Sequence, residues 1–263
     1  MKIAVIGGGN MGGAIAAGAI KASIVAPQDV TISHLEPKCH DLFGEFLDQI
    51  KIEDDNAKSI EGADLVVVAV KPWMMSEVLG EICPAIDRKR QALVSIAAGV
   101  NFEALAEMMK CGELGDMGMY RIIPNTAIAI AQSVSFICKH NTTAIQDEQL
   151  LQIFDSLGAS FVITEDQMTP LTSLSSCGIA FAYKYMDASI EGGVELGIDQ
   201  DLARKVVLQT VRGALMMLET NGTMPQPEID KVTTKGGITF KGLDAMAESG
   251  FTEAVKSGLR ASR

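Results

Sequence analysis

Three glycines near the start of the chain, Gly7, Gly9 and Gly12, have the spacing Gly-x-Gly-x-x-Gly. They follow an apolar run at residues 3–6 and precede an Ala- and Gly-rich stretch that reaches Lys21. Between a strand and a helix, such glycines allow a sharp turn, close approach of the backbone to a pyrophosphate, and tight helix–strand packing. The free N–H groups that open the helix attract the anion. The spacing therefore predicts a dinucleotide-binding loop, the alternative being a glycine-rich turn without a ligand.

The end of the second predicted strand, at residues 30–33, decides which dinucleotide fits. NAD enzymes commonly place Asp or Glu there to bind the ribose 2′-OH, whereas a 2′-phosphate needs small polar and basic groups. Ser33 and His34 occupy this position, and Glu36 and Lys38 come later. With no carboxylate at the predicted strand tip, the sequence favours NADP(H), with NAD(H) still possible. Alternatively, the basic side chains here are ordinary solvated loop residues.

Three further turns follow predicted strands, at residues 69–72, 95–99 and 121–126. Ligands of open α/β sheets bind at the carboxyl ends of the strands, where these turns are expected to lie. Pro72 stiffens the first turn, and small residues such as Ala97 in the second leave room for a nicotinamide ring. Each turn alone also fits an ordinary strand–turn connection, but together the three indicate one ligand-binding edge.

A polar, glycine-bearing turn at residues 233–239 stands out in the C-terminal part of the chain. It precedes a predicted helix, so its hydroxyl groups and backbone N–H groups suit a small carboxylate. These include the Thr234 hydroxyl group and the Gly237 N–H group. The alternative is a helix N-cap without a ligand.

Residues 1–163 alternate strand-like and helix-like segments, which is the pattern of a doubly wound α/β domain of Rossmann type. Continuous apolar runs such as residues 65–70 fit a parallel sheet covered by helices on both faces. We therefore expect a dinucleotide-binding domain over residues 1–163. The predicted strands are residues 3–6, 30–33, 50–52, 65–70, 92–97, 120–123, 134–138 and 160–163, and helices are predicted at 38–48, 74–86, 101–109 and 146–157.

Residues 164–263 show long helical periodicity and no strand signal, which predicts an all-helical substrate and dimerisation domain. About a hundred residues are few for a self-sufficient core. The apolar helix faces therefore predict burial against a second copy, hence a homodimer, although they also fit packing within one chain. The predicted helices are residues 174–196, 200–219, 239–248 and 251–259, with a break at 222–227.

The net charge of −11 argues against a nucleic-acid or anionic-membrane partner, because phosphate binding needs clustered Lys and Arg. No run approaches the roughly 18 apolar residues of a membrane-spanning helix, and the N-terminus does not read as a signal peptide. The five cysteines are dispersed without a Cys-x-x-Cys pair, which is typical of reduced thiols, and the three histidines lack metal-ligand spacing. We expect a cytoplasmic protein without a metal.

Several of these segments together resemble the pyrroline-5-carboxylate reductase family, and the resemblance spans nearly the whole chain. Asn10 and Met11 within the glycine loop, and the Ala-Val-Lys-Pro turn, are specific to this family and its close relatives. The matching segments are residues 7–12, 69–72, 95–100 and 124–126, and Gly236 and Gly237 with Thr239.

The resemblance implies an oxidoreductase of proline biosynthesis, in which NAD(P)H reduces the C=N bond of 1-pyrroline-5-carboxylate to give L-proline. It also implies dimers that interlock through the helical domain and stack into rings. Thr239 is the implied catalytic residue, its hydroxyl group bonded to the ring nitrogen, and the substrate-binding residues are Thr234, Gly236, Gly237, Ile238 and Thr239. The implied cofactor-binding residues are Gly7, Gly9, Asn10, Met11, Gly12, Ser33, Asn56, Ala69, Val70, Lys71 and Pro72, to which their positions add His34 and Ala97.

Departures from the family pattern surround the expected substrate site. Lys235 replaces a proline in the substrate turn, and Ile238 replaces Thr or Ala. At the head of the long helix, Ile179 and Phe181 stand where the family usually has proline and tyrosine. Cys177 nearby is interpreted as a small apolar filler.

Three other functions remain open on the sequence. The first is reduction of a different cyclic imine, since the substrate turn is altered. The second is an activity of the β-hydroxyacid dehydrogenase type, which uses a lysine with an asparagine four residues later. Lys184 is present, but Ala188 holds the later position and argues against it. The third is a catalytically degenerate paralogue that binds NADP.

Overall fold

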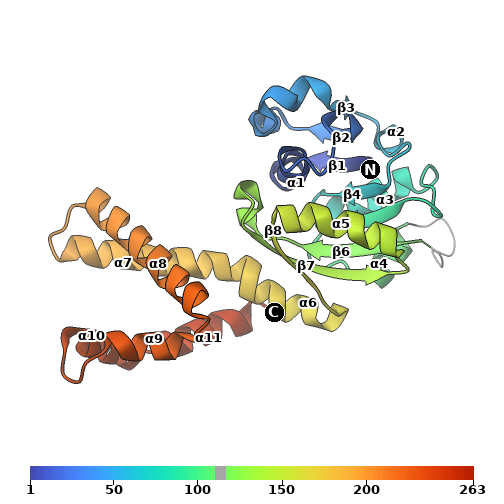
Figure 1. Ribbon diagram of the computed structural model, residues 1–263. Coiled ribbons are helices and arrows are strands. Elements are labelled where there is room, and N and C mark those ends of the chain that lie inside the picture. The colour runs from blue at the N-terminus through green and yellow to red at the C-terminus, as the bar shows by residue number, and fades with distance from the viewer. Residues whose placement is uncertain (110–116) are drawn as a thin grey trace. The chain divides into compact units, whose positions relative to one another are not determined.

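The computed structural model describes residues 1–109 and 117–263 and divides into two compact units, Met1–Ser176 and Cys177–Arg263. The first unit contains an eight-stranded sheet with helices on both faces (Figure 1). The strands are β1 Ile3–Gly8, β2 Val30–Leu35, β3 Lys51–Glu53, β4 Leu65–Val68, β5 Ala92–Ser95, β6 Met119–Ile123, β7 Ser133–His140 and β8 Gly158–Val162. Every predicted strand is present, and the fold class is confirmed.

The strand order is β3-β2-β1-β4-β5-β6-β7-β8. Strand β1 pairs in parallel with both β2 and β4, so the order reverses beside it. In open α/β sheets ligands bind at such a switch point, outside the carboxyl ends of the strands. The glycine loop follows β1 and therefore lies at this point.

The sheet is not wholly parallel, and in this respect the sequence-based expectation is wrong. Strand β7 runs antiparallel to β6, and β8 is parallel to β7. The connection from β6 to β7 contains only the short 3-10 helix Thr126–Ile130. A parallel crossover needs a dozen or more residues, usually including a helix, so this shorter connection reverses the chain.

The core of the first unit lies on both faces of the sheet, as alternating strand residues require. On one face, Val5 and Val67 pack with apolar residues of α1 and α5. On the other, Ile6 and Val66 pack with residues of α3 and α4. The helices of this unit are α1 Asn10–Lys21, α2 Asn56–Ser59, α3 Met75–Ile82, α4 Phe102–Met108, α5 Ala144–Ser156 and α6 Met168–Thr172.

One predicted helix of this unit is wrong in type. Residues 38–48 do not form an amphipathic α-helix but lie within two 3-10 helices, Pro37–Leu42 and Gly44–Gln49. Gly44, the first residue of the second 3-10 helix, has a φ of +53°, a left-handed conformation that an α-helix does not continue through. Buried Cys39 and Phe43 still provide the apolar side that produced the periodic pattern.

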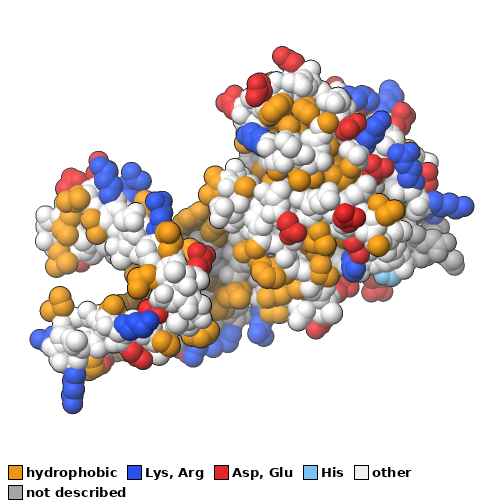
Figure 2. Space-filling view, viewed as in Figure 1, with side chains coloured by type: hydrophobic (Ala, Val, Ile, Leu, Met, Phe, Trp, Pro, Cys, Tyr) orange, Lys and Arg blue, Asp and Glu red, His pale blue; other side chains and the backbone are white. Residues whose placement is uncertain are grey.

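The second unit is wholly helical, as expected, and its helices are α7 Gly178–Glu195, α8 Gln200–Asn221, α9 Pro225–Val232, α10 Ile238–Glu248 and α11 Phe251–Ala261. Helix α9 was not predicted, because its two prolines suggested a break; Pro225 instead occupies the first helical position, which proline suits. Ala203 is the one buried residue of this unit, and apolar side chains lie on its surface (Figure 2). The unit has no closed core of its own.

Three of the cysteines, Cys39, Cys138 and Cys177, are free thiols. Cys83 is disulfide-bonded, so the expectation of reduced thiols is wrong for this residue. Cys111 lies outside the described residues. The boundary predicted between residues 163 and 164 stays a prediction.

Candidate active site

In the glycine loop between β1 and α1, backbone atoms lie close to two of the three motif positions, Gly7 and Gly12. Gly7 has a φ of +93°, a left-handed conformation that glycine adopts readily. A Cβ atom on Gly12 would lie 2.2 Å from the carbonyl oxygen of Gly7. One on Gly9 would lie 2.9 Å from Oε1 of Glu36. Gly7 and Gly12 therefore require glycine, whereas the flexible Glu36 side chain can move away from Gly9. The resulting cradle fits the pyrophosphate of a dinucleotide.

Helix α1 begins at Asn10, with Gly9 as its N-cap and no side chain bonded to its first N–H groups. Its first turn contains no acidic residue, so the positive end of the helix dipole is available to an anion. The Met11 side chain is half-buried and packs on the core. Asn10 is exposed, and its Oδ1 accepts a weak 3.8 Å hydrogen bond from the Cys39 thiol.

Ser33 and Asn56, both predicted cofactor contacts, are brought together by the fold. The buried Ser33 hydroxyl group donates a hydrogen bond to Oδ1 of Asn56. Asn56 Nδ2 in turn donates to Oε2 of Glu81 at 2.6 Å. The pair thus fixes the end of β2 to the start of α2. His34 is exposed and has a φ of +52°.

The tip of β2 differs from the prediction, which placed no carboxylate there. The strand continues to Leu35, which pairs with Gly8, so Glu36 follows it directly. The Glu36 N–H group donates a 3.0 Å hydrogen bond to the Gly8 carbonyl oxygen, which fixes this residue beside the glycine loop. Its carboxylate forms a 2.7 Å ion pair with Lys38. The sequence signal was present, but the predicted strand was two residues too short to show it.

The three predicted turns follow β4, β5 and β6. These strands are parallel to one another and to β1, so the turns lie at the same edge of the sheet as the glycine loop, as predicted. Ala69 donates its N–H to the Ile6 carbonyl oxygen at 2.8 Å, and Ile96 donates to Val68 at 3.2 Å. Ala69 and Val70 are half-buried, Lys71 and Pro72 are exposed, and Ala97 is buried. The exposed Trp73, the only tryptophan, follows directly after Pro72.

Two serines beyond the predicted motifs hold the turn after β6. Asn125 Nδ2 donates a 3.1 Å hydrogen bond to the Ser175 hydroxyl group, and the Ser176 hydroxyl group donates to the Pro124 carbonyl oxygen at 3.3 Å. Both serines belong to the π-helix Ser173–Cys177. Such π segments occur often at functional sites. Periodicity suggested one continuous helix here, so the π segment was missed.

A buried cation lies between β6 and the segment after β8. Arg121 forms an ion pair with Glu165, and its side chain is only 8% exposed. Glu165 Oε1 also accepts a 3.0 Å hydrogen bond from the N–H group of Phe102, whose ring lies 5.8 Å from the Arg121 guanidinium. The arginine is thereby bound to its neighbours in the domain.

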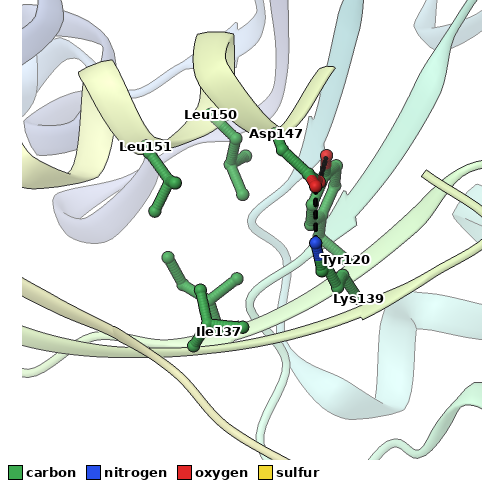
Figure 3. Close-up of a pocket in the computed structure, with 7 residues that line it drawn as sticks. Tyr120, Ile137, Lys139, Asp147, Leu150 and Leu151 are labelled. Atoms are coloured by element: carbon green, nitrogen blue, oxygen red, sulfur yellow. Dashed lines mark hydrogen bonds and ion pairs between the residues drawn. The ribbon is translucent and has the colours of Figure 1, made fainter. Parts of the chain in front are cut away.

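A small cavity of about 30 Å³ lies beside Tyr120, Lys139 and Asp147, with apolar side chains along its other walls (Figure 3). Asp147 accepts a 2.7 Å hydrogen bond from the Tyr120 hydroxyl group and forms a 2.5 Å ion pair with Lys139. Burial opposes the ionised form of Asp147, but the hydrogen bonds from Lys139, Tyr120 and Thr142 together lower its pKa. Burial and the Asp147 hydrogen bond raise the pKa of Tyr120. This space is too small for a ring-sized substrate.

The predicted substrate turn lies in the second unit and opens helix α10. Gly236 has a φ of +75°, and Gly237 is the N-cap. The Gly237 N–H group donates to the Thr234 carbonyl oxygen at 2.9 Å, so it is already bonded within the turn. The N–H groups of Ile238 and Thr239, in the first helical turn, lack intrahelical partners. Both residues are exposed, as is Lys235.

The departures at the head of α7 also have clear positions. Phe181 packs near Gly258, where an added Cβ atom would lie 3.4 Å from the phenyl ring. Cys177 and Ile179 are half-buried. Lys184 forms a 2.9 Å ion pair with Asp187 on the surface of the helix.

No group of three His, Cys, Asp or Glu side chains is placed to hold a metal ion within residues 1–109 and 117–263. In the same part of the chain, no helix is long and apolar enough to cross a bilayer.

Two protein-family models match different parts of the chain. Residues 165–263 match the family model for pyrroline-5-carboxylate reductase dimerisation. Residues 2–99 match the model described as NADP oxidoreductase coenzyme F420-dependent.

The relatives in these comparisons cover nearly the whole chain. Pyrroline-5-carboxylate reductase of Methanosarcina acetivorans is 32% identical over 260 residues, or 98% of this chain and 94% of that protein. That of Glycine max is 30% identical over 248 residues, covering 94% of this chain and 88% of that protein. The crystal structure of Plasmodium falciparum pyrroline carboxylate reductase with NADP bound has a TM-score of 0.88 at 27% identity, covering 100% of this chain and 95% of that one. The protein therefore belongs to the pyrroline-5-carboxylate reductase family.

Proposed function

We propose that the protein reduces 1-pyrroline-5-carboxylate to L-proline, with NADP(H) as the preferred cofactor and NAD(H) as a second one. The observation that carries the proposal is the glycine-shaped cradle at the uncapped start of α1, in a chain of this family. The nicotinamide supplies a hydride when the cofactor is bound. The protein's task is then to position the reactants and stabilise charge, which needs neither a metal nor a strong base.

On the cofactor side, we propose that Gly7, Gly9, Gly12 and the backbone N–H groups of Asn10 and Met11 hold the pyrophosphate. The exposed turn at Lys71 and Pro72 and the compact residue Ala97 would bind farther along the dinucleotide, on the carboxyl edge of β4 and β5. Ser33 and Asn56 contribute by fixing the end of β2, and His34 lies exposed beside them. Each assignment is supported by the position of the residue.

On the substrate side, we propose that the turn at residues 234–239 binds the carboxylate through Thr234 and the free N–H groups of Ile238 and Thr239. The Thr239 hydroxyl group would bond the ring nitrogen. Hydride adds to the carbon of the C=N bond, and the π electrons of that bond move to the nitrogen. The protonated imine thus becomes the secondary amine of proline.

A different cyclic imine is the second candidate substrate. Lys235 and Ile238 support it, because they change the charge and bulk of the turn that is proposed to bind the carboxylate. The β-hydroxyacid dehydrogenase alternative has less support, because Ala188 stands where that class has an asparagine.

A homodimer formed through the second unit is also part of the proposal. Helix α8 exposes Leu202, Val206 and Met216, each more than half accessible. An open groove of about 560 Å³ between α7 and α8 is lined in part by Tyr183 and Leu208. The unit has only one buried residue. Burial of its apolar faces against a second copy of the chain would be more favourable than their exposure to water. Rings of dimers and a cytoplasmic location stay predictions.

The testing experiment is NADPH and NADH oxidation by the purified protein with 1-pyrroline-5-carboxylate, beside a six-membered cyclic imine carboxylate. Preferential turnover of the five-membered ring, with proline as the product, supports the proposal. Preferential turnover of the six-membered ring favours the second candidate. Dinucleotide binding without reduction of either imine contradicts both and favours the degenerate paralogue.

A further inference from the structure

We propose that Glu36 and Lys38 select between the two reduced dinucleotides at the ribose 2′ position, Glu36 favouring NADH and Lys38 favouring NADPH. The proposal rests on the proposed use of NAD(P)H and names the two side chains of this chain that set the choice. The Glu36 carboxylate and the Lys38 ammonium group lie side by side after β2 and have opposite effects on the choice of cofactor.

The position of Glu36 is the first argument. Strand β2 ends at Leu35, and the Glu36 N–H group is bonded to the Gly8 carbonyl oxygen, so the residue is fixed at the switch point of the sheet. Its Oε1 lies 2.9 Å from the place where a Cβ atom on Gly9 would stand. In dinucleotide-binding domains, an acidic side chain at the end of this strand accepts a hydrogen bond from the ribose 2′-OH.

The charges of the pair are the second argument. An ionised carboxylate accepts hydrogen bonds from a hydroxyl group but repels a phosphate, whereas an ammonium group attracts the phosphate. The Glu36 carboxylate and Lys38 are 2.7 Å apart and lie 48% and 62% exposed. The hydrogen bond and charge of Glu36 raise the pKa of Lys38 above its ordinary value, so Lys38 is a cation at neutral pH.

The pairing itself explains why both cofactors remain possible. With the ion pair closed, Lys38 partly neutralises Glu36, and neither group imposes its preference fully. A 2′-phosphate recruits Lys38 away from Glu36, while a 2′-OH bonds the carboxylate and leaves Lys38 in place. Because both side chains reach solvent, this exchange requires no change in the core.

Calorimetric titration of NADH and NADPH into Glu36→Gln and Lys38→Gln variants, without substrate, tests the proposal. We expect Glu36→Gln to raise the preference for NADPH, as a ratio of the two dissociation constants, by about tenfold or more. Lys38→Gln should move that ratio in the opposite direction. Steady-state kcat/KM values with the two cofactors should shift in the same directions.

Matched controls are Glu107→Gln in α4 and Lys89→Gln before β5, which remove the same charges at exposed positions on other elements of the first unit. Neither should change the ratio by more than about twofold. Ratios that stay at the wild-type value in both test variants, or that move together in one direction, would overturn the proposal. Since binding is measured without an imine, a shifted ratio supports it even where 1-pyrroline-5-carboxylate is not reduced, so the two proposals fail separately.

Discussion

Gly12 has no space for a single additional carbon atom, because a Cβ atom there would collide with the Gly7 carbonyl oxygen at 2.2 Å. We expect Gly12→Ala to weaken NADPH binding by about tenfold or more, through a displacement of α1 from the loop. The measurement is a calorimetric titration of folded protein, checked by circular dichroism. Gly80→Ala in α3 is the control, since nothing lies within 4 Å of its Cβ position. Equal affinity in the two variants would contradict the proposed role of the loop.

The Thr239 hydroxyl group is the proposed partner of the substrate nitrogen. Its removal in Thr239→Val should lower kcat with 1-pyrroline-5-carboxylate by roughly 10- to 100-fold, because the developing amine loses a hydrogen bond. NADPH affinity should stay unchanged, and Thr239→Ser should restore most of the rate. Thr252→Val, at an exposed position of α11, is the matched control. A wild-type rate for Thr239→Val would refute the assignment.

How far individual residues are predictable depends on the kind of signal they carry. The motif glycines are recognisable because their spacing reflects a backbone constraint within a few residues. Glu36 was recognised in the sequence but was placed beyond the strand tip, because the end of β2 was predicted two residues too early. The bonds from Ser175 and Ser176 to the turn after β6 join positions about fifty residues apart, and local patterns do not encode them.

The link between α5 and the β6–β7 pair depends on one carboxylate. Asp147 bonds Tyr120 and Lys139, and its lowered pKa means that it binds its proton less readily in the folded state. Its contribution to stability is therefore present above the unfolded pKa near 4 and is lost as the pH falls through the lower folded value. This sign predicts an acid-sensitive contact.

Asp147→Asn should lower the free energy of unfolding by about 1–3 kcal/mol near neutral pH, because a buried hydroxyl group and a lysine lose a charged partner. The difference from the wild type should shrink below about pH 4. Urea denaturation across this range measures it. Glu148→Gln, an exposed neighbour on the same helix, serves as the control. A difference that is constant with pH would show that the carboxylate charge is not responsible.

Elements were predictable where one physical signal dominated. Strands β1, β4 and β5 were found because buried apolar runs are unambiguous in a sheet covered on both faces. The edge strands β3 and β8 are largely exposed and carry a weaker signal. The direction of β7 was not predictable from its own residues, because it depends on the length of the connection from β6 to β7. Helix α9 was not predicted because its first turn contains two prolines, which are tolerated there.

The second unit is expected to be stable only as a pair of copies. Placing a charge on its exposed apolar face, as in Val206→Glu, should shift the protein to a monomer and lower its melting temperature, because the interface would bury an unpaired carboxylate. Light scattering and thermal unfolding at several concentrations measure both effects. Gln209→Glu adds the same charge at an exposed polar position of α8 and is the control. A monomeric wild type would contradict the homodimer.

Ala203 is the one buried residue of the second unit. If the proposed homodimer forms, the last step of folding of this unit is an encounter between two molecules. A bimolecular step slows in proportion to dilution, so the lag between synthesis and activity should lengthen as expression falls. During that interval the new chain presents apolar helix faces, the feature that chaperones and proteases recognise. The abundance of active protein would then respond more steeply than linearly to the rate at which the chain is made.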